Sequence, residues 1–218
     1  ETIYYPNKIK QIVGRLNTQN LSEEEERENV EAISELIEYY KGIFTILSSC
    51  AARQLEEVTF RRSTISVADL CEYAVKYFRK ASKGKTSRIE FLTEPIEKRI
   101  IGDINQLRFL LENLIDEALT VHEDGILKLH AAEDGNYIRF LFTDTRREKS
   151  VDELNKLFYP NLARMTSGEK GELRGTEYLI CKQIIRDHDE FAGRRGCRIN
   201  AEPAQKGGFT VYFTLPKR

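Results

Sequence analysis

The sequence predicts an α+β chain of two parts, a long helical hairpin over residues 1–57 and an α/β sandwich over residues 58–218. In the first part, apolar residues recur with helical spacing over several turns. From Val58 onward, short segments of strand-like pattern alternate with helical segments instead. A chain of 218 residues, of which 40% are apolar and 32% charged, is long enough to form two such domains.

The hairpin is predicted from two helical segments and the polar break between them. The first helix is expected around Lys8–Asn17, and the break covers Asn17–Leu21. Ser22 and Glu25 have the spacing of a capping box, which predicts the start of the second helix. This helix is expected to continue to about Glu57, since only Gly42 interrupts it.

The second helix carries a broad apolar stripe whose members lie alternately three and four residues apart. These are Val30, Ile33, Ile37, Tyr40, Phe44, Leu47 and Ala51. A helix of about 35 residues with such a stripe cannot bury it against one short partner. We expect two hairpins to pair as a homodimeric four-helix bundle. The alternative is that the stripe packs on the second domain of the same chain.

The second part is expected to form a mixed sheet with helices on one face. A Gly-containing mobile stretch is expected at Met165–Gly175, and a short polar loop at Ser82–Ser87. The predicted helices are Ser66–Ala81, Asp103–Thr120, Val151–Phe158 and Thr176–Asp187. The predicted strands are Thr59–Val67, Arg88–Leu92, Lys98–Ile101, Gly125–Ala132, Tyr137–Asp144, Cys197–Ala201 and Phe209–Leu215.

Composition argues against several classes of function. The formal net charge of −1 lacks the basic excess typical of nucleic-acid binding, so no nucleic-acid partner is expected. No apolar run approaches the roughly 18 residues of a membrane span, so this segment is expected to make no membrane contact. The four cysteines are widely separated, which favours reduced thiols in the cytoplasm. The sequence leaves open a membrane anchor or sensor domain upstream of Glu1.

Three ordered motifs and the order of the elements carry a resemblance to a known family. The run Gly102–Ala118 is similar to an N box, which usually begins D-x-x-x-L and ends N-L-L-x-N-A. The run Phe142–Thr145 ends a strand where the family has D-x-G-x-G, and Gly175–Lys182 resembles G-x-G-L-G-L-x-I-C/V-K. With the final strand Gly207–Pro216, these motifs resemble the dimerisation and Bergerat-type ATPase core of two-component sensor histidine kinases.

The resemblance implies an ATP site, Mg²⁺ and a phosphorelay partner. It places Asn113, Glu117, Asp144 and Gly175 at the nucleotide, with Asp144 accepting from the adenine amino group. Glu117 stands where the family has the Asn that holds Mg²⁺, and a carboxylate is also a suitable ligand for Mg²⁺. The implied partner is the receiver domain of a response regulator.

The motifs also depart from the family pattern at positions that face the nucleotide. Arg146 and Glu148 replace the two glycines after Asp144, and Glu177 replaces a glycine at the start of a helix. Arg146 or Arg147 either contacts phosphate or belongs to a solvated turn. A sensor kinase core with an atypical nucleotide site, a switch that binds nucleotide without transferring phosphate, and a pseudokinase that signals by conformation all remain open.

No histidine lies in residues 1–57, where the family places its phosphoacceptor. Glu1 and Pro6 resemble the family's H-E-x-x-T-P box from its Glu onward, so the acceptor either precedes Glu1 or is lost. His122 and His130 are expected to be surface or strand residues, and His188 a helix-end residue. We therefore assign no catalytic residue, and this segment alone is expected not to phosphorylate itself.

Overall fold

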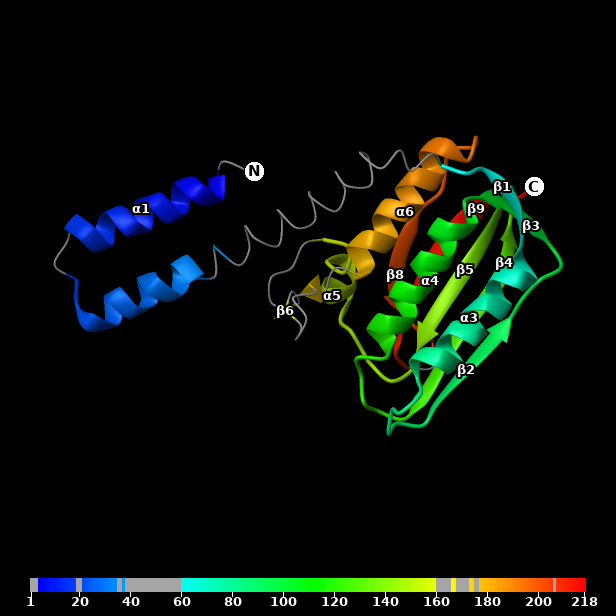
Figure 1. The fold of residues 1–218 in the computed structure, drawn as a ribbon, viewed down its shortest axis with the longest axis horizontal. Helices are drawn as coiled ribbons and strands as arrows, with labels where there is room; N and C mark the ends of the chain where they lie inside the picture. The colour runs from blue at the N-terminus through cyan, green and yellow to red at the C-terminus, as the bar shows by residue number, and fades with distance from the viewer. Residues whose placement is uncertain are drawn as a thin grey trace. The chain divides into compact units, whose positions relative to one another are not determined.

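The computed structural model describes residues 4–18, 21–34, 37, 60–159, 166–167, 173–174, 177–205 and 207–218 (Figure 1). The chain divides into two compact units. The first comprises Glu1–Val58 and Pro160–Thr176, and the second comprises Thr59–Tyr159 and Glu177–Arg218.

The first unit contains helix α1 (Tyr4–Thr18) and a second helical stretch over residues 23–34. The predicted capping box is present at the start of this stretch. The Glu25 amide donates to Ser22 Oγ at 3.4 Å, and the Ser22 amide donates to Glu25 Oε2 at 2.9 Å. These hydrogen bonds lower the pKa of Glu25. The remainder of the predicted helix, to Glu57, lies outside the described residues except for Ile37.

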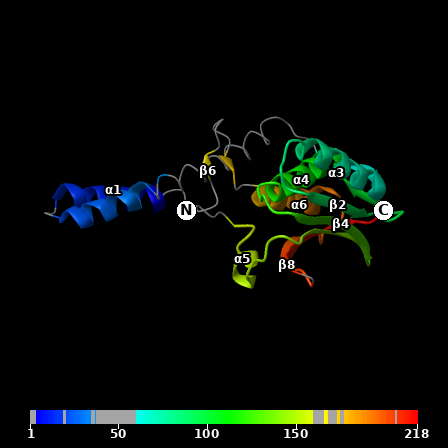
Figure 2. The same ribbon diagram turned by 90° about the horizontal axis from the view of Figure 1, so that it is seen from below.

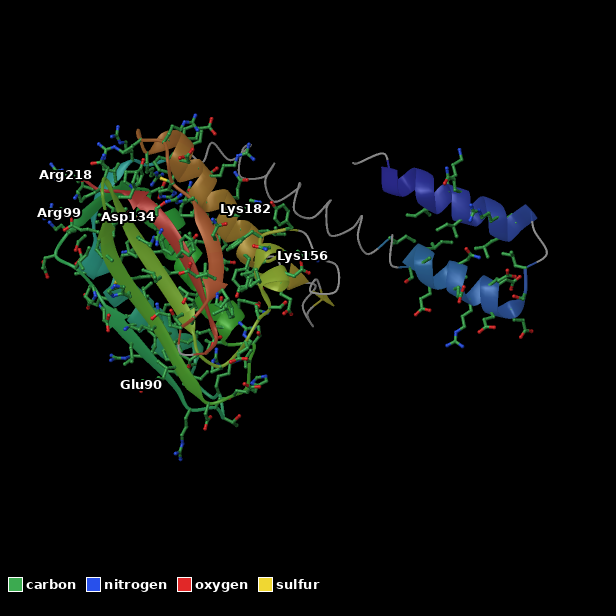
Figure 3. The ribbon with its side chains drawn as sticks, turned by 180° about the vertical axis from the view of Figure 1, so that it is seen from behind. Glu90, Arg99, Asp134, Lys156, Lys182 and Arg218 are labelled. Carbon is green, nitrogen blue, oxygen red and sulfur yellow. The ribbon has the colours of Figure 1, made fainter. Side chains whose placement is uncertain are left out.

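The second unit is built on a five-stranded mixed sheet with strand order β2-β4-β5-β9-β8. β2 pairs parallel with β4, and the other neighbours pair antiparallel, so the mixed sheet predicted from the sequence is confirmed. The strands are β2 (Ile89–Glu94), β4 (Gly125–Asp134), β5 (Tyr137–Asp144), β8 (Ile199–Pro203) and β9 (Phe209–Pro216). Figure 3 views the sheet from behind, with Asp134 at one end and Glu90 at the other.

Helices α3 (Val67–Ala81), α4 (Ile104–Ala118) and α6 (Glu177–Phe191) cover one face of this sheet (Figures 1 and 2). The strands alternate buried and more exposed side chains, as a sheet covered on one face requires. The Phe140 and Phe213 rings, on neighbouring strands, stack with centroids 5.0 Å apart. The fully buried core side chains include Leu70, Ile100, Leu107, Leu110, Leu111, Leu114, Ile115, Leu127, Leu129 and Ile138.

Several elements differ from their predicted bounds or surroundings, among them the following. The strand predicted at Thr59–Val67 is confined to β1 (Ser63–Ser66), which pairs with β3 (Arg99–Gly102) in a separate two-stranded sheet. Helix α5 ends at Asn155 rather than Phe158, because the chain turns there to bury Leu157 and Phe158. Within the stretch expected to be irregular, the short strands β6 (Thr166–Ser167) and β7 (Leu173–Arg174) pair antiparallel.

None of the described helices is both long enough and apolar enough to cross a membrane.

Candidate functional site

Helix α4 positions the two N-box residues of the predicted site. Asn113 and Glu117 lie four residues apart, and each exposes only 8–9% of its surface. The spacing places both side chains on the same side of the helix, as the sequence predicts. Asn113 Nδ2 donates to the Phe109 carbonyl one turn earlier, at 2.7 Å. The amide is therefore already turned toward its own helix backbone.

Asp144 ends strand β5 and is almost completely buried, with 1% of its surface exposed. The end of β5 lies at the same end of the sheet as Glu90, because the Thr145 amide donates to Ile126 O and Ile126 pairs with Glu90. Arg147 lies between the two predicted carboxylates. Its guanidinium is 3.4 Å from Asp144 Oδ2 and 3.5 Å from Glu117 Oε1. The structure thus brings Glu117 and Asp144 to one site, while Gly175 lies outside the described residues.

The side chain that fills this site belongs to Arg146, which replaces the first glycine of the family motif. Its Nε donates to Asp144 Oδ1 at 2.8 Å and its Nη2 to Asp144 Oδ2 at 2.9 Å. This bidentate arrangement is the strongest geometry for an arginine–carboxylate pair. The Arg146 backbone amide adds a third hydrogen bond to Asp144 Oδ1 at 3.0 Å.

Arg146 also reaches the last turn of α4. Its Nη2 donates to the Ala118 carbonyl at 2.6 Å and its Nη1 to the Val121 carbonyl at 3.3 Å. The side chain is fully buried, as is the pair it makes with Asp144. Arg146 therefore does not lie in a solvated turn, which was one of the two alternatives predicted for Arg146 or Arg147.

Gly125 provides the space for the Arg146 stem. A Cβ atom added at Gly125 would lie 2.4 Å from Arg146 Cγ, a separation that real side chains do not adopt. We call the buried Arg146 side chain the plug. Its position depends on Gly125, which lies 21 residues earlier in the chain, at the start of β4. The sequence did not predict this contact between Gly125 and Arg146.

Further charges surround the site. The Arg147 guanidinium and the Lys149 ammonium lie over the Phe209 ring, 5.6 and 5.5 Å from its centroid. At the start of α6, the charge of Glu177 acts on Asp116 of α4. Burial, together with the charges of Glu112 and Glu177, raises the pKa of Asp116 despite its hydrogen bond from Tyr77.

Arginine side chains contact both carboxylates of the candidate site. Each oxygen of Asp144, the predicted acceptor for the adenine amino group, already accepts a hydrogen bond from the Arg146 side chain. The Glu117 carboxylate, the predicted Mg²⁺ ligand, faces Arg147 instead. In the described part of the chain, no group of three or more His, Cys, Asp or Glu residues is placed to hold a metal ion.

Among the histidines, His188 lies in the last turn of α6, as predicted, but its burial was not expected. It is fully buried on α6, where its Nδ1 bonds to the Ile184 carbonyl at 2.8 Å and its Nε2 accepts from the Asp103 amide at 3.1 Å. Burial lowers the pKa of His188. His130 is a strand residue that contacts Glu94 at 2.9 Å, and His122 is exposed, as expected.

Comparison with known proteins agrees with the fold and the motifs. A family model described as "Histidine kinase-, DNA gyrase B-, and HSP90-like ATPase" matches residues 102–218. The signal transduction histidine-protein kinase BaeS of Escherichia coli K12 is 25% identical over 163 residues, which cover 73% of this chain and 33% of BaeS. The sensor histidine kinase RcsC of the same organism is 25% identical over 127 residues, 57% of this chain and 13% of RcsC. The chain thus spans a third or less of the length of these two relatives.

Solved structures show the same fold. The catalytic domain of histidine kinase ThkA aligns with a TM-score of 0.55 at 19% identity and covers 72% of this chain and 96% of that domain. Full-length ShkA in complex with AMPPNP aligns with a TM-score of 0.59 at 17% identity, covering 99% of this chain and 44% of ShkA. ThkA in complex with the response regulator TrrA aligns with a TM-score of 0.56 at 17% identity, over 100% of this chain and 59% of the matched one.

Proposed function

The chain belongs to the histidine kinase-, DNA gyrase B- and HSP90-like ATPase family, and we propose that it is a sensor histidine kinase core that signals by conformation rather than by ATP chemistry. Domains of this family typically bind ATP with Mg²⁺. In this chain, we propose, the adenine end of that site is closed by Arg146. The domain then serves as a pseudokinase, whose output is a change of shape and of protein contacts.

The observation that carries this proposal is the contact of Arg146 with both oxygens of Asp144. The carboxylate accepts two side-chain hydrogen bonds and one backbone hydrogen bond from Arg146. An adenine amino group that takes the place of Arg146 at Asp144 would have to displace a buried guanidinium that also donates to the Ala118 carbonyl of α4 and to the Val121 carbonyl just beyond that helix. Displacement would leave buried groups without partners, which costs about 1–3 kcal/mol per group and more when the group is charged.

Charge at the opposite side of the site supports the same proposal. Glu117 replaces the amide that the family uses to hold Mg²⁺, and it faces Arg147 at 3.5 Å. Glu177 occupies the first turn of α6, where a helix N-terminus would otherwise favour phosphate.

The proposed partners follow from the first unit and from the relatives. Val13, Val30 and Ile37 expose between 40% and 58% of their surface, and a second copy of the chain would cover such side chains in a homodimer. The ThkA structure contains the response regulator TrrA, which supports a receiver domain as the proposed docking partner here. We propose a cytoplasmic location, as for the intracellular part of a membrane-anchored sensor.

The second candidate is a core that binds Mg-ATP, either as a kinase or as a switch. Asn113 and Asp144 favour it, because both retain the identity and burial expected of nucleotide contacts. Asp144 is free to bind adenine in this alternative only if Arg146 swings away. The two candidates therefore differ in one measurable property, the affinity of the unmodified chain for Mg-ATP.

Isothermal titration with ATP tests the proposal, in the presence of Mg²⁺ and again with a chelator. We expect no binding by the wild-type chain at millimolar ATP. Arg146→Gly restores the family's glycine and is expected to lower the dissociation constant at least about tenfold, equivalent to roughly 1.4 kcal/mol. Arg139→Ala is the control, because Arg139 also belongs to the β5 region but is partly exposed and lies over Tyr212.

Mg²⁺-dependent ATP binding by the wild-type chain at or below millimolar ATP would reject the closed site. This result is decisive even if the variant folds poorly, because it needs only the wild-type protein. Binding by Arg139→Ala but not by the wild type would show that the gain does not depend on the plug.

A further inference from the structure

The three residues that lead into the second unit, Phe60–Arg62, lie against the ends of two helices, and we call them the N-terminal strap. The Phe60 ring meets the His188 ring edge-on at 4.9 Å and lies 5.9 Å from the Phe191 ring. Both aromatic partners belong to α6. The strap is therefore packed on the C-terminal end of that helix before β1 begins.

A buried carboxylate ties the strap to α4. The Arg61 backbone amide donates to Asp103 Oδ2 at 2.8 Å. The other oxygen, Oδ1, accepts from the amides of Asn105 and Gln106 at 2.9 and 3.3 Å, which makes Asp103 the N-cap of α4. One side chain thus performs two separable tasks, one for the helix and one for the strap.

His188 fixes the backbone of the same capping residue. Its Nε2 accepts from the Asp103 amide, and its ring lies so close to Gly102 that an added Cβ would be 2.9 Å away. Farther along the strap, the Arg62 guanidinium lies over Gly193, 2.9 Å from where a Cβ would stand. Strap, α4 and α6 therefore meet at one junction, which no feature of the nucleotide site explains.

We propose that the N-terminal strap is a latch that the Asp103 carboxylate holds on the first turn of α4, and that opens without unfolding the domain. The strap lies at the start of the second unit, one residue after Thr59, so it is the first described segment of that unit after the chain leaves Glu1–Val58. α4 also carries Asn113 and Glu117 and binds Arg146 at its other end. The latch does not depend on whether the site binds ATP.

Asp103→Asn separates the two tasks of the carboxylate. Asn is as good an N-cap as Asp, so its oxygen can still accept from the first turn of α4. Its NH₂ group, however, is a donor and cannot accept from the Arg61 amide. Phe60→Ala is the second variant, because it removes the aromatic packing without altering the cap.

Hydrogen–deuterium exchange of the full 218-residue chain reports both effects. We expect exchange in the peptide covering residues 60–64 to quicken about tenfold or more in Asp103→Asn, as loss of a charge-assisted hydrogen bond predicts. Exchange in residues 107–116 should stay within about twofold of wild type, since α4 remains capped and packed. Phe60→Ala should give the same pattern.

Asp69→Asn is the matched control, because Asp69 is an exposed acid in the first turn of α3 and undergoes the same chemical change. It should leave exchange of the strap unaltered. Unchanged strap exchange in both Asp103→Asn and Phe60→Ala would show that these contacts do not hold the strap. A parallel rise in the strap and in residues 107–116 would show that Asp103 supports the whole domain, and would reject a separable latch.

Discussion

At each end of helix α4, charged side chains bind backbone groups that have no partner within the helix, and the charges at the two ends have opposite signs. At the N-terminal end, the Asp103 carboxylate accepts hydrogen bonds from amides of the first turn. At the C-terminal end, the Arg146 guanidinium donates to the Ala118 and Val121 carbonyls, and Lys85 Nζ donates to the Leu119 carbonyl at 3.1 Å. Both arrangements satisfy free backbone groups and match the helix dipole.

The ends differ in where their capping groups come from. Asp103 immediately precedes the helix, as ordinary N-caps do, whereas Arg146 reaches back from the loop after β5. Its position is one where relatives of the sensor-kinase type carry glycine. In the proposed function, this internal side chain takes the place that a ligand would otherwise occupy beside Asp144.

Asp144→Ala is the strongest test of the C-terminal end. It would leave the fully buried Arg146 guanidinium without its counter-charge. Removing one partner of a buried ion pair destabilises a protein by about 3–5 kcal/mol, so we expect a loss of that size in the free energy of unfolding. Denaturant unfolding monitored by circular dichroism measures it.

The control for this prediction is Asp134→Ala. Asp134 contacts Arg139 at 3.5 Å, and both side chains are at least one-third exposed. Exposed pairs of this kind contribute about 0–1 kcal/mol. Equal losses in the two alanine variants would show that the Asp144–Arg146 pair is no more than a surface ion pair.

The N-terminal end of α4 shows how much of the fold the sequence predicts. The periodic apolar residues between Leu107 and Ala118 and the preceding Asp103 indicate a capped helix with one buried face, and the structure has both. Local spacing is enough here because cap and helix are adjacent in the chain. The sequence also places Asn113 and Glu117 on one face of this helix and Asp144 at the end of a strand, as found.

The C-terminal end shows what the sequence did not indicate. The local pattern around Arg146 does not show that its side chain would turn inward, because the space depends on Gly125 and two of the acceptors, the Val121 and Ala118 carbonyls, lie 25 and 28 residues earlier in the chain. The burial of His188 likewise depends on Asp103 and Phe60, which are more than 80 residues away in the chain. Contacts of this kind arise only when distant elements pack, and a local pattern contains no information on them.

Lowering the pH tests the N-terminal end of α4. We expect a smaller loss in the free energy of unfolding than in Asp144→Ala. Burial lowers the pKa of His188 in the folded state, whereas the unfolded value is near 6.5. The contribution of His188 to stability is therefore complete above about pH 6.5 and is lost as the pH falls through the lowered pKa, because the unfolded chain binds the proton more readily. The loss should not exceed about 1.4 kcal/mol per pH unit.

Denaturant unfolding between about pH 5 and 7 measures this loss, in a range above the ordinary pKa of Asp and Glu. His188→Gln is the matched variant, because its amide keeps one donor and one acceptor but does not titrate. The free energy of unfolding of the variant should depend less steeply on pH than that of the wild type. Equal slopes would assign the pH dependence to groups other than His188.

Lys85→Ala gives the smallest expected effect and separates the two cations at the C-terminal end of α4. Lys85 is exposed, unlike Arg146; it donates to the Leu119 carbonyl, and its charge also acts on Asp116. A cation at an exposed helix C-terminus stabilises by about 0.3–1 kcal/mol at low ionic strength, and salt screens it. Lys83→Ala is the control, since no described acceptor contacts the Lys83 side chain. If Lys85→Ala costs no more than Lys83→Ala at low salt, the C-terminal end of α4 depends on the buried Arg146 alone.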